Sequence, residues 1–412
     1  MNGGEFNTQS SVTSMYRWAT RLHSELPYRF GKGRALPAWH FFFEVTRRCN
    51  LRCKMCQYID WLESVPTKMQ ADNELTTEEW LSVIDQTPPW AFITFTGGEV
   101  FVRKDFMQIL EHACKKRRVH MISNATMLTE ERAQRLVELA PKRLGGKGFN
   151  FAGVSLDGIG EVHDQIRAQR GAFEKSTRGV RMLTEFRKKA GKKVPLVHIN
   201  FVLQDENMEC LPDMPAMVKD IGADILNLLT ETRAHDIQEL GHDDPGKWSS
   251  GDMRPVSQIR REKMDYALRK CKEEADRVGI GLRFPRMPYE EVLNHYGEGY
   301  EMQNFDCRAI WSNLFVGAKG GVYPCWIYKA GNVRDESLRS IWNKMGMRDF
   351  RQRRKESAFA VCNGCCEMEH KSYHKAGEAN IPAVDPTMPG FTTPDQSAPE
   401  REPAREPEVV GK

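Results

Sequence analysis

The 412-residue sequence predicts a protein of the α/β class, built on a parallel sheet and followed by a small cysteine-rich unit. From residue 39 onward, short apolar runs alternate with helix-like segments, as in chains whose parallel strands are connected by helices. Glycines and polar residues gather where these apolar runs end, and such sheets bind ligands at the carboxyl ends of their strands. Both an open doubly wound sheet and a partial α/β barrel fit this pattern.

Six apolar runs have the length and composition of strands: residues 40–46, 91–97, 118–124, 149–157, 194–203 and 223–231. Helical periodicity predicts helices over residues 76–86, 104–117, 129–140, 172–189 and 207–222. Two of these helices begin with an N-cap signal. Thr76 or Thr77 precedes two glutamates, and so does Thr129, so a threonine side chain can accept hydrogen bonds from the first turn.

The remaining composition predicts how the chain is organised. Residues 1–38 are expected to be an N-terminal extension with a short helix over 13–26. A core over 39–235 is followed by a more polar helical linker over 236–300, with one amphipathic helix at 256–278. Residues 301–375 form the cysteine-bearing unit. The segment 376–412 is rich in proline and charge and poor in aliphatic residues, so it is expected to be a disordered tail.

Charge and hydropathy exclude several classes of function. The 60 basic and 56 acidic residues give a net charge of +4 that is spread along the chain, which argues against nucleic-acid binding. No apolar run approaches the length of a membrane span. The N-terminus lacks the apolar segment of a secretory signal, so we expect a cytoplasmic protein whose thiols stay reduced.

Eleven cysteines therefore need an explanation other than disulfides. Cys114, Cys210 and Cys271 continue helical stripes of apolar residues, and we expect them to be buried in the core. The other eight are clustered in the sequence as Cys49, Cys53 and Cys56; Cys307 and Cys325; and Cys362, Cys365 and Cys366.

The first cluster, "CNLRCKMC", follows the first strand directly. A structural zinc site needs four closed ligands, so His40 or a distant cysteine would have to complete it. An iron–sulfur cluster held by only Cys49, Cys53 and Cys56 keeps one iron with an open coordination position, where a substrate or cofactor can bind. The spacing on a loop after a strand favours the iron–sulfur cluster.

This stretch resembles the cluster loop of the radical S-adenosylmethionine (radical SAM) superfamily, and the resemblance extends over about residues 39–232. It implies a partial (β/α)6 TIM-like barrel. It also implies that Cys49, Cys53 and Cys56 hold the catalytic [4Fe–4S] cluster, whose open iron binds S-adenosylmethionine (SAM).

Two further motifs follow the second and third strands. "TFTGGEV" resembles the family's GGE motif, which implies that Gly97, Gly98 and Glu99 hold the amino group of SAM. Glycine suits a backbone that must approach a charged ligand, and glutamate supplies a counter-charge. "ISNAT" resembles another family segment and implies that Asn124 lies near the cofactor, although Ala125 replaces the usual glycine.

The end of the fourth strand carries "VSLDG", which matches a common family pattern. The resemblance implies that Ser155 and Asp157 contact the carboxylate or ribose of SAM. It further implies that Arg167 pairs with that carboxylate, with Arg170 as a near alternative.

The C-terminal unit, with "GGVYPC" and "VCNGCC", resembles the SPASM/twitch extension that carries auxiliary iron–sulfur clusters. No cysteine follows Cys366, so five thiols can fill only one four-thiolate cluster. The expected ligands of this single auxiliary [4Fe–4S] cluster are Cys307, Cys325, Cys362, and Cys365 or Cys366. A structural zinc ion at the same four thiols is the alternative.

The resemblance implies a radical SAM oxidoreductase of the maturase type. An electron from a donor such as flavodoxin or ferredoxin cleaves SAM, and the 5′-deoxyadenosyl radical abstracts hydrogen from a substrate placed over the barrel mouth. The leading hypothesis is oxidation or cross-linking of a peptide or protein. One alternative is dehydrogenation or C–C bond formation on a small molecule, with His198, Asn200 and Asn227 lining the pocket. The other is a non-enzymatic iron–sulfur electron carrier.

Overall fold

The structure, a computed structural model, describes residues 22–232, 256–325, 327–356, 358–359, 362 and 364–372. The predicted N-terminal helix is therefore covered only from residue 22, and residues 22–30 are helical. The expected disordered tail at 376–412 and residues 236–255 of the expected linker lie outside the described residues.

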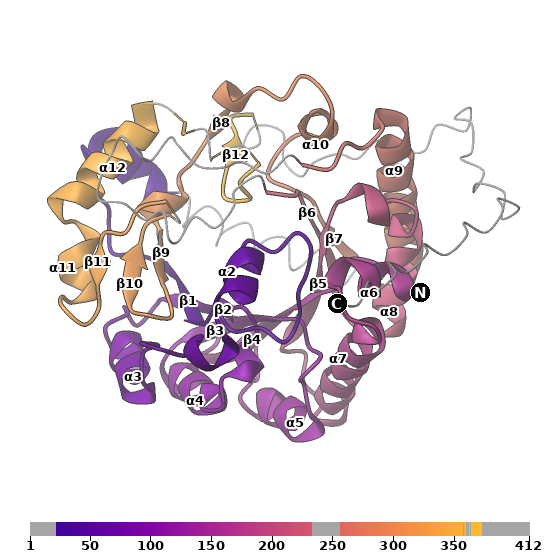
Figure 1. Ribbon diagram of the computed structural model, residues 1–412, viewed down its shortest axis with the longest axis horizontal. Coiled ribbons are helices and arrows are strands. Elements are labelled where there is room, and N and C mark those ends of the chain that lie inside the picture. The colour runs from indigo at the N-terminus through magenta and orange to yellow at the C-terminus, as the bar shows by residue number, and fades with distance from the viewer. Residues whose placement is uncertain are drawn as a thin grey trace, which may run out of the picture.

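One ten-stranded sheet organises the molecule, in the strand order β11-β10-β9-β1-β2-β3-β4-β5-β6-β7 (Figure 1). The strands from β9 through β1 to β7 are parallel, whereas β10 and β11 pair antiparallel. This order has two free ends, so the sheet is a partial barrel rather than a closed one, as the family resemblance implied. The strands are β1 His40–Thr46, β2 Phe92–Gly97, β3 Arg118–Ser123, β4 Gly148–Ser155, β5 Leu196–Val202, β6 Ile225–Leu229, β7 Gly281–Arg283, β9 Asn313–Val316, β10 Gly321–Tyr323 and β11 Gly331–Asn332. A separate two-stranded sheet joins β8 Phe305–Asp306 to β12 Glu369–His370.

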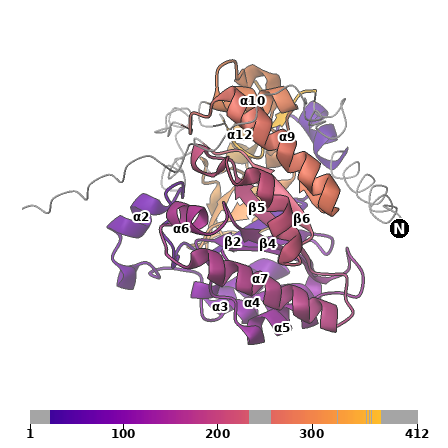
Figure 2. The ribbon, with the colours of Figure 1, turned by 90° about the vertical axis from the view of Figure 1, so that its right-hand side faces the viewer.

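Helices follow one another around the outside of the sheet (Figure 1), and Figure 2 shows α3, α4, α5 and α7 along the same side of the strands. Their bounds are α2 Ile59–Ser64, α3 Thr77–Asp85, α4 Phe106–Lys116, α5 Glu130–Glu138, α6 Glu161–Arg167, α7 Ala172–Lys189, α8 Met214–Asp220, α9 Arg261–Val278, α10 Tyr289–Tyr296, α11 Leu338–Trp342 and α12 Met345–Glu356. Within the described residues, none of these helices combines the length and the apolar character that crossing a bilayer requires.

Both predicted N-caps are present. The Thr76 side chain accepts a hydrogen bond from the Glu79 backbone N–H at 3.2 Å, and the Glu79 carboxylate accepts one from the Thr76 N–H at 2.7 Å. This reciprocal pair is a capping box, and it decides between Thr76 and Thr77. Thr129 caps α5 by accepting a bond from the Arg132 N–H at 3.3 Å.

The two faces of the sheet differ in chemistry. The face toward the outer helices carries fully buried apolar side chains such as Phe43, Phe95 and Val197, which form the main core. Alternate residues point to the opposite, inner face, which carries His120 and His198 among others. Burial of the apolar face fixes the register of the strands, because a slip of one residue would expose it.

The C-terminal unit extends the sheet of the core. Strand β9 pairs in parallel with β1, from His40 beside Asn313 to Phe43 beside Val316. The rings of Phe42 and Phe315 stack across this pair with centroids 4.6 Å apart. The sequence did not predict β7, β9, β10 or β11, because runs of two to four residues are too short to show a period.

Candidate cluster and cofactor site

The cysteine loop (residues 47–56) leaves the carboxyl end of β1 and brings three thiols together. Each sulfur faces an N–H donor: Leu51 for Cys49 at 3.4 Å, Arg167 for Cys53 at 3.5 Å, and Tyr58 for Cys56 at 3.4 Å. Donors of this kind favour a thiolate over a thiol.

The electrostatics of the loop fit a bound metal. Burial, together with the charges of Glu99, Cys53 and Cys56, raises the pKa of Cys49 to about 12. Three thiolates so close together are therefore unfavourable unless a cation compensates them, and metal coordination deprotonates thiols outright. The donor set thus suits an iron–sulfur cluster.

The two glycines of the GGE motif pack against the backbone of the cysteine loop. A Cβ on Gly97 would lie 2.1 Å from the Thr46 carbonyl oxygen, and one on Gly98 would lie 2.3 Å from that of Arg47. The N–H groups of Gly98 and Glu99 donate to the carbonyls of Thr46 and Arg48, each at 2.9 Å. The sequence prediction explained these glycines by approach to a ligand. In the structure, the small size of these glycines lets the end of β2 pack directly against the backbone that leads to Cys49.

Glu99 lies beneath the loop and is 1 % exposed. Its carboxylate accepts hydrogen bonds from the Ser123 hydroxyl at 2.8 Å, the Asn124 N–H at 2.7 Å and the Phe101 N–H at 3.2 Å. Burial raises the pKa of Glu99, while these bonds act in the opposite direction. The carboxylate is thereby held at the carboxyl ends of β2 and β3, next to Cys49.

Asn124 joins β3 to the cysteine loop. Its Nδ2 donates to Asn50 Oδ1 at 3.1 Å, and Thr126 donates its N–H and its hydroxyl to Asn124 Oδ1. Ala125 adopts a left-handed backbone with φ of 58°. A glycine, as in the family segment that this stretch resembles, would adopt this conformation more easily, because a Cβ is disfavoured at positive φ.

Arg167, rather than Arg170, faces the cysteine loop. The Arg167 guanidinium contacts the Cys53 sulfur and forms an ion pair with Asp157, whereas Arg170 is exposed. Asp157 is fully buried, and its other oxygen accepts the Val202 N–H at 2.9 Å. Asp157 therefore supports Arg167 from behind. Ser155 ends β4 beside Asn200 of β5, at the same edge of the sheet.

The C-terminal thiols also converge. Burial raises the pKa of Cys325 well above its usual range, and the nearby charges of Cys362, Cys365 and Cys307 act in the same direction. We call Cys307, Cys325, Cys362 and Cys365 the auxiliary thiols. Cys366 is exposed and hydrogen-bonds to Cys365. The arrangement favours Cys365 over Cys366 as the fourth member of the group.

The auxiliary thiols lie at the opposite end of β1 from the cysteine loop. Asn313, which sits beside His40 at the amino end of β1, donates to Glu367 at 3.3 Å, and Glu367 directly follows Cys366. Cys49 lies beyond the carboxyl end of β1. A seven-residue strand spans about 20 Å, so the two thiol groups lie near opposite ends of a strand of that length. The space between them runs along the inner face of the sheet, and not only above the barrel mouth as the sequence predicted.

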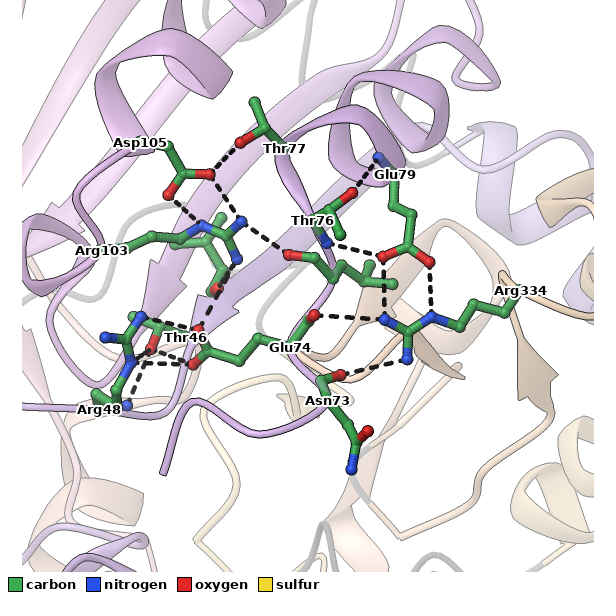
Figure 3. A network of polar contacts seen from close by, with 12 residues as sticks. Thr46, Arg48, Asn73, Glu74, Thr76, Thr77, Glu79, Arg103, Asp105 and Arg334 are labelled. Atoms are coloured by element: carbon green, nitrogen blue, oxygen red, sulfur yellow. Dashed lines mark hydrogen bonds and ion pairs between the residues drawn. The ribbon is translucent and has the colours of Figure 1, made fainter. Parts of the chain in front are cut away.

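A polar network fastens the cysteine loop to the C-terminal unit (Figure 3). Arg48, directly before Cys49, donates to the Glu74 carboxylate at 2.8 Å. Arg103 donates to the backbone carbonyls of Val45 and Leu75 at 3.1 and 2.7 Å. From the C-terminal unit, Arg334 pairs with Glu79 at 2.6 Å. Nothing in the local sequence signalled this network, because its members come from distant segments.

Comparison with known protein families agrees with this geometry. Residues 43–217 match the family model described as the radical SAM superfamily, and residues 307–366 match an iron–sulfur cluster-binding domain named SPASM. The chain contains a radical SAM domain followed by a SPASM domain. Members of this family are enzymes, and the two domains bring a SAM-binding [4Fe–4S] cluster, SAM itself and an auxiliary iron–sulfur cluster.

Relatives of this chain are named for different biosynthetic products. It is 26% identical over 315 residues to the antilisterial bacteriocin subtilosin biosynthesis protein AlbA of Bacillus subtilis, with 74% of this chain and 59% of AlbA covered. It is 27% identical to the AdoMet-dependent heme synthase of Nitratidesulfovibrio vulgaris, with 82% and 85% covered. Among solved structures, Streptococcus suis SuiB bound to S-adenosylmethionine has a TM-score of 0.58 at 12% identity, with 89% of this chain and 80% of SuiB covered. That likeness shows the fold.

Proposed function

We propose that Cys49, Cys53 and Cys56 hold the SAM-binding [4Fe–4S] cluster and that the auxiliary thiols hold the second cluster. The observation that carries this proposal is the position of Arg167. Its guanidinium reaches the Cys53 sulfur, and its buried Nε–H has no hydrogen-bond acceptor among the described residues. A buried N–H without an acceptor is unfavourable, so we expect a bound ligand to accept this hydrogen bond. The carboxylate of SAM supplies such an acceptor.

Each side chain then has a defined task. Asp157 holds Arg167 in place, so that the arginine binds the SAM carboxylate beside Cys53. Glu99 offers its remaining lone pairs to the amino group of SAM, while Ser123 and Asn124 orient the carboxylate from the other side. When bound, the reduced cluster supplies the electron that cleaves SAM to methionine and a 5′-deoxyadenosyl radical, which abstracts hydrogen from the substrate.

We infer that the substrate is a peptide or protein side chain, which the enzyme oxidises or cross-links as a maturase-type oxidoreductase. AlbA, which is named for bacteriocin biosynthesis, supports this inference, as does SuiB, which has also been solved with its precursor peptide SuiA. A cytoplasmic flavodoxin or ferredoxin is the proposed electron donor. A small-molecule substrate is the second candidate, and the heme synthase relative favours it because the match covers 85% of that protein.

The test is anaerobic reconstitution of the full chain with iron, sulfide, SAM and a strong reductant, followed by chromatographic detection of 5′-deoxyadenosine. We expect 5′-deoxyadenosine and about eight irons per chain, since two four-iron clusters are proposed. Cys53→Ala should abolish SAM cleavage and leave about four irons, whereas Cys271→Ala, in a buried helix position away from both thiol groups, serves as the matched cysteine control. Wild-type protein that fills both clusters without forming 5′-deoxyadenosine would refute the proposal.

Candidate substrates are separated by a second experiment. Short peptides encoded beside the gene are incubated with the active enzyme and analysed by mass spectrometry for loss of hydrogen. Turnover of a small metabolite, with no change in any such peptide, would favour the second candidate.

A further inference from the structure

A row of polar side chains crosses the inner face of the sheet directly below the proposed SAM site. Ser155 of β4 lies beside Asn200 of β5, Asn200 beside Asn227 of β6, and Asn227 beside Arg283 of β7. Neighbours in a parallel register point to the same face. The row therefore continues the line of Ser155 across the inner face to the edge strand β7.

Two residues before Ser155 on β4, three side-chain nitrogen atoms lie close to Gly153. The position that a Cβ of residue 153 would take is 2.7 Å from His198 Nε2, 3.0 Å from His120 Nε2 and 3.1 Å from Asn200 Nδ2. We call His120, Gly153, His198 and Asn200 the Gly153 cradle. Gly153 does not adopt a positive φ, so backbone conformation does not demand a glycine there. The missing Cβ lets the three nitrogens approach the backbone of β4 and one another.

Hydrogen bonds behind the cradle fix what it can offer. Asn227 Nδ2 donates to Asn200 Oδ1 at 2.8 Å, which turns the Asn200 amide N–H groups toward the cradle. Thr94 Oγ1 lies 2.7 Å from His40 Nε2 and 3.0 Å from His120 Nδ1. A hydroxyl donates only one proton. If His40 Nε2 donates its proton to Thr94 Oγ1, the hydroxyl proton of Thr94 goes to His120 Nδ1. His120 then carries its own proton on Nε2, facing the cradle.

Two buried nitrogens of this group lack a protein partner. His120 Nε2, which faces Gly153, and His198 Nδ1, the ring nitrogen of His198 that does not, have no hydrogen-bond partner among the described residues, although His198 is only 5 % exposed. A buried polar nitrogen without a hydrogen-bond partner destabilises the protein, because it has lost its bonds to water. Such groups need an explanation, and a ligand that is absent from the protein chain itself provides one.

The charge around the cradle selects the ligand. Burial, together with the charge of Arg283, lowers the pKa of His120 to about 3, so the ring is neutral at pH 7. Burial likewise lowers the pKa of His198, followed by the effects of His120 and Arg283. Burial also lowers the pKa of His40, followed by the effects of His120, Arg286 and Arg118. In the described part of the chain, the charged side chains that shift these three rings are thus arginines and the histidines themselves. N–H donors with the charge of Arg283 close by favour an anionic ligand.

We propose that the Gly153 cradle, with Asn227 and Arg283 behind it, binds a carboxylate of the substrate. The inference rests on the proposed function, because it places this carboxylate between the SAM site and the auxiliary thiols. The carboxylate belongs either to an acidic residue of a peptide or to a small organic acid, and both present the same group to the cradle. It anchors the substrate on the inner face, so that the carbon to be attacked lies toward Ser155.

The test is ligand-observed saturation-transfer NMR on the anaerobic, reconstituted enzyme with SAM. N-acetylglutamate N-methylamide represents the peptide source and glutarate the small acid, and their uncharged counterparts are N-acetylglutamine N-methylamide and glutaramide. We expect at least one carboxylate probe to bind about tenfold more tightly than its amide, and the better carboxylate identifies the source. Equal binding of both acids and their amides would overturn the proposal.

Variants localise the binding. Gly153→Ala places a Cβ 2.7–3.1 Å from the three nitrogens and so displaces them without removing any polar group. His198→Phe removes the nitrogens of that ring while keeping a ring. Each variant should weaken carboxylate binding about tenfold. Gly297→Ala, whose Cβ would have its nearest contact at 3.4 Å, and His112→Gln, on the outer helix α4, should bind the probe as wild type does. Iron content and far-UV circular dichroism report folding. If Gly153→Ala does not fold, His198→Phe decides the result, and unchanged binding in the folded variant overturns the proposal.

Different experimental results would refute the proposed subsite and the proposed function. Wild-type enzyme that binds the carboxylate probe selectively but forms no 5′-deoxyadenosine would refute the function and leave the subsite standing. Wild-type enzyme that forms 5′-deoxyadenosine but does not distinguish acid from amide would refute the subsite alone.

Discussion

Arg354 should set the reduction potential of the auxiliary cluster. The side chain is 5 % exposed on α12, and its Nη2 lies 2.8 Å from the Met368 sulfur. Burial alone would lower the pKa of Arg354, but the auxiliary thiols, Cys307 first, more than offset this and raise it. Burial in turn raises the pKa of Cys362, and Arg354 opposes that change through charge and a hydrogen bond. A fixed cation therefore contacts the thiol group.

The size of the effect follows from Coulomb's law. A buried guanidinium in contact with a thiolate lies roughly 6 Å from the centre of a cluster, which gives about 2.8 kcal/mol at an effective dielectric constant of about 20. For a one-electron couple about 59 mV corresponds to about 1.4 kcal/mol, so the expected contribution is on the order of 100 mV. The cation stabilises the more negative reduced cluster, and removing it should make reduction harder.

The assay is an EPR-monitored redox titration of the reconstituted enzyme. Arg354→Gln should lower the midpoint potential of the auxiliary cluster by on the order of 100 mV, and Arg354→Lys, which keeps the charge, should recover most of that loss. Arg353→Gln is the matched control, because Arg353 lies on the same helix but is half exposed and pairs with Asp349 at 2.9 Å. A fully loaded Arg354→Gln variant whose potential equals that of wild type would show that the reasoning is wrong.

Three further changes test other parts of the site. Gly98→Ala would place a Cβ 2.3 Å from a backbone carbonyl oxygen of the cysteine loop, so we expect loss of the SAM-binding cluster and a fall from about eight to about four irons in an iron assay; full iron loading would contradict this. Asp157→Asn leaves the Arg167 cation without its buried partner, and urea denaturation should show a loss of about 3–5 kcal/mol in unfolding free energy together with weaker SAM binding; wild-type stability and affinity would argue against the supporting role. Arg334→Gln breaks an ion pair with Glu79 whose side chains are 37% and 32% exposed, so the loss in the same assay should stay below about 1 kcal/mol; a several-fold larger loss would mean that the network in Figure 3 acts as one cooperative unit.

The central part of the fold could be predicted because each of its strands is a recognisable apolar run in the local sequence. Runs such as residues 194–203 are apolar over the length of a strand, and the structure places β5 within that range. The edge strands could not be predicted in this way. Strand β7 has three residues, and β9 has four, and each depends on a neighbour that lies far away in the sequence. Their pairing is a tertiary effect that no local period reveals.

For the site, spacing predicted which loops meet but not which atoms touch. The cysteine spacing and the GGE motif each lie within one segment, whereas the contact between Arg167 and Cys53 joins residues 114 positions apart. The choice between Arg167 and Arg170 depended on backbone geometry. Ala168 adopts a left-handed conformation that ends α6, so Arg167 stays on the helix and faces inward, and Arg170 turns to the surface. A single sequence does not show such a turn, because alanine rarely adopts a positive φ.

Strand β1 explains why the position of the auxiliary thiols escaped the sequence prediction. Its carboxyl end leads into the cysteine loop, and its amino end lies beside Asn313, which holds the segment that follows Cys366. The separation of the two thiol groups is thus fixed by the length of one buried strand, and not by the linker between the domains. A rigid strand of this kind keeps the proposed radical site and the auxiliary cluster at a constant distance. A substrate that is to meet both must therefore lie along the inner face, where the Gly153 cradle is placed to hold it.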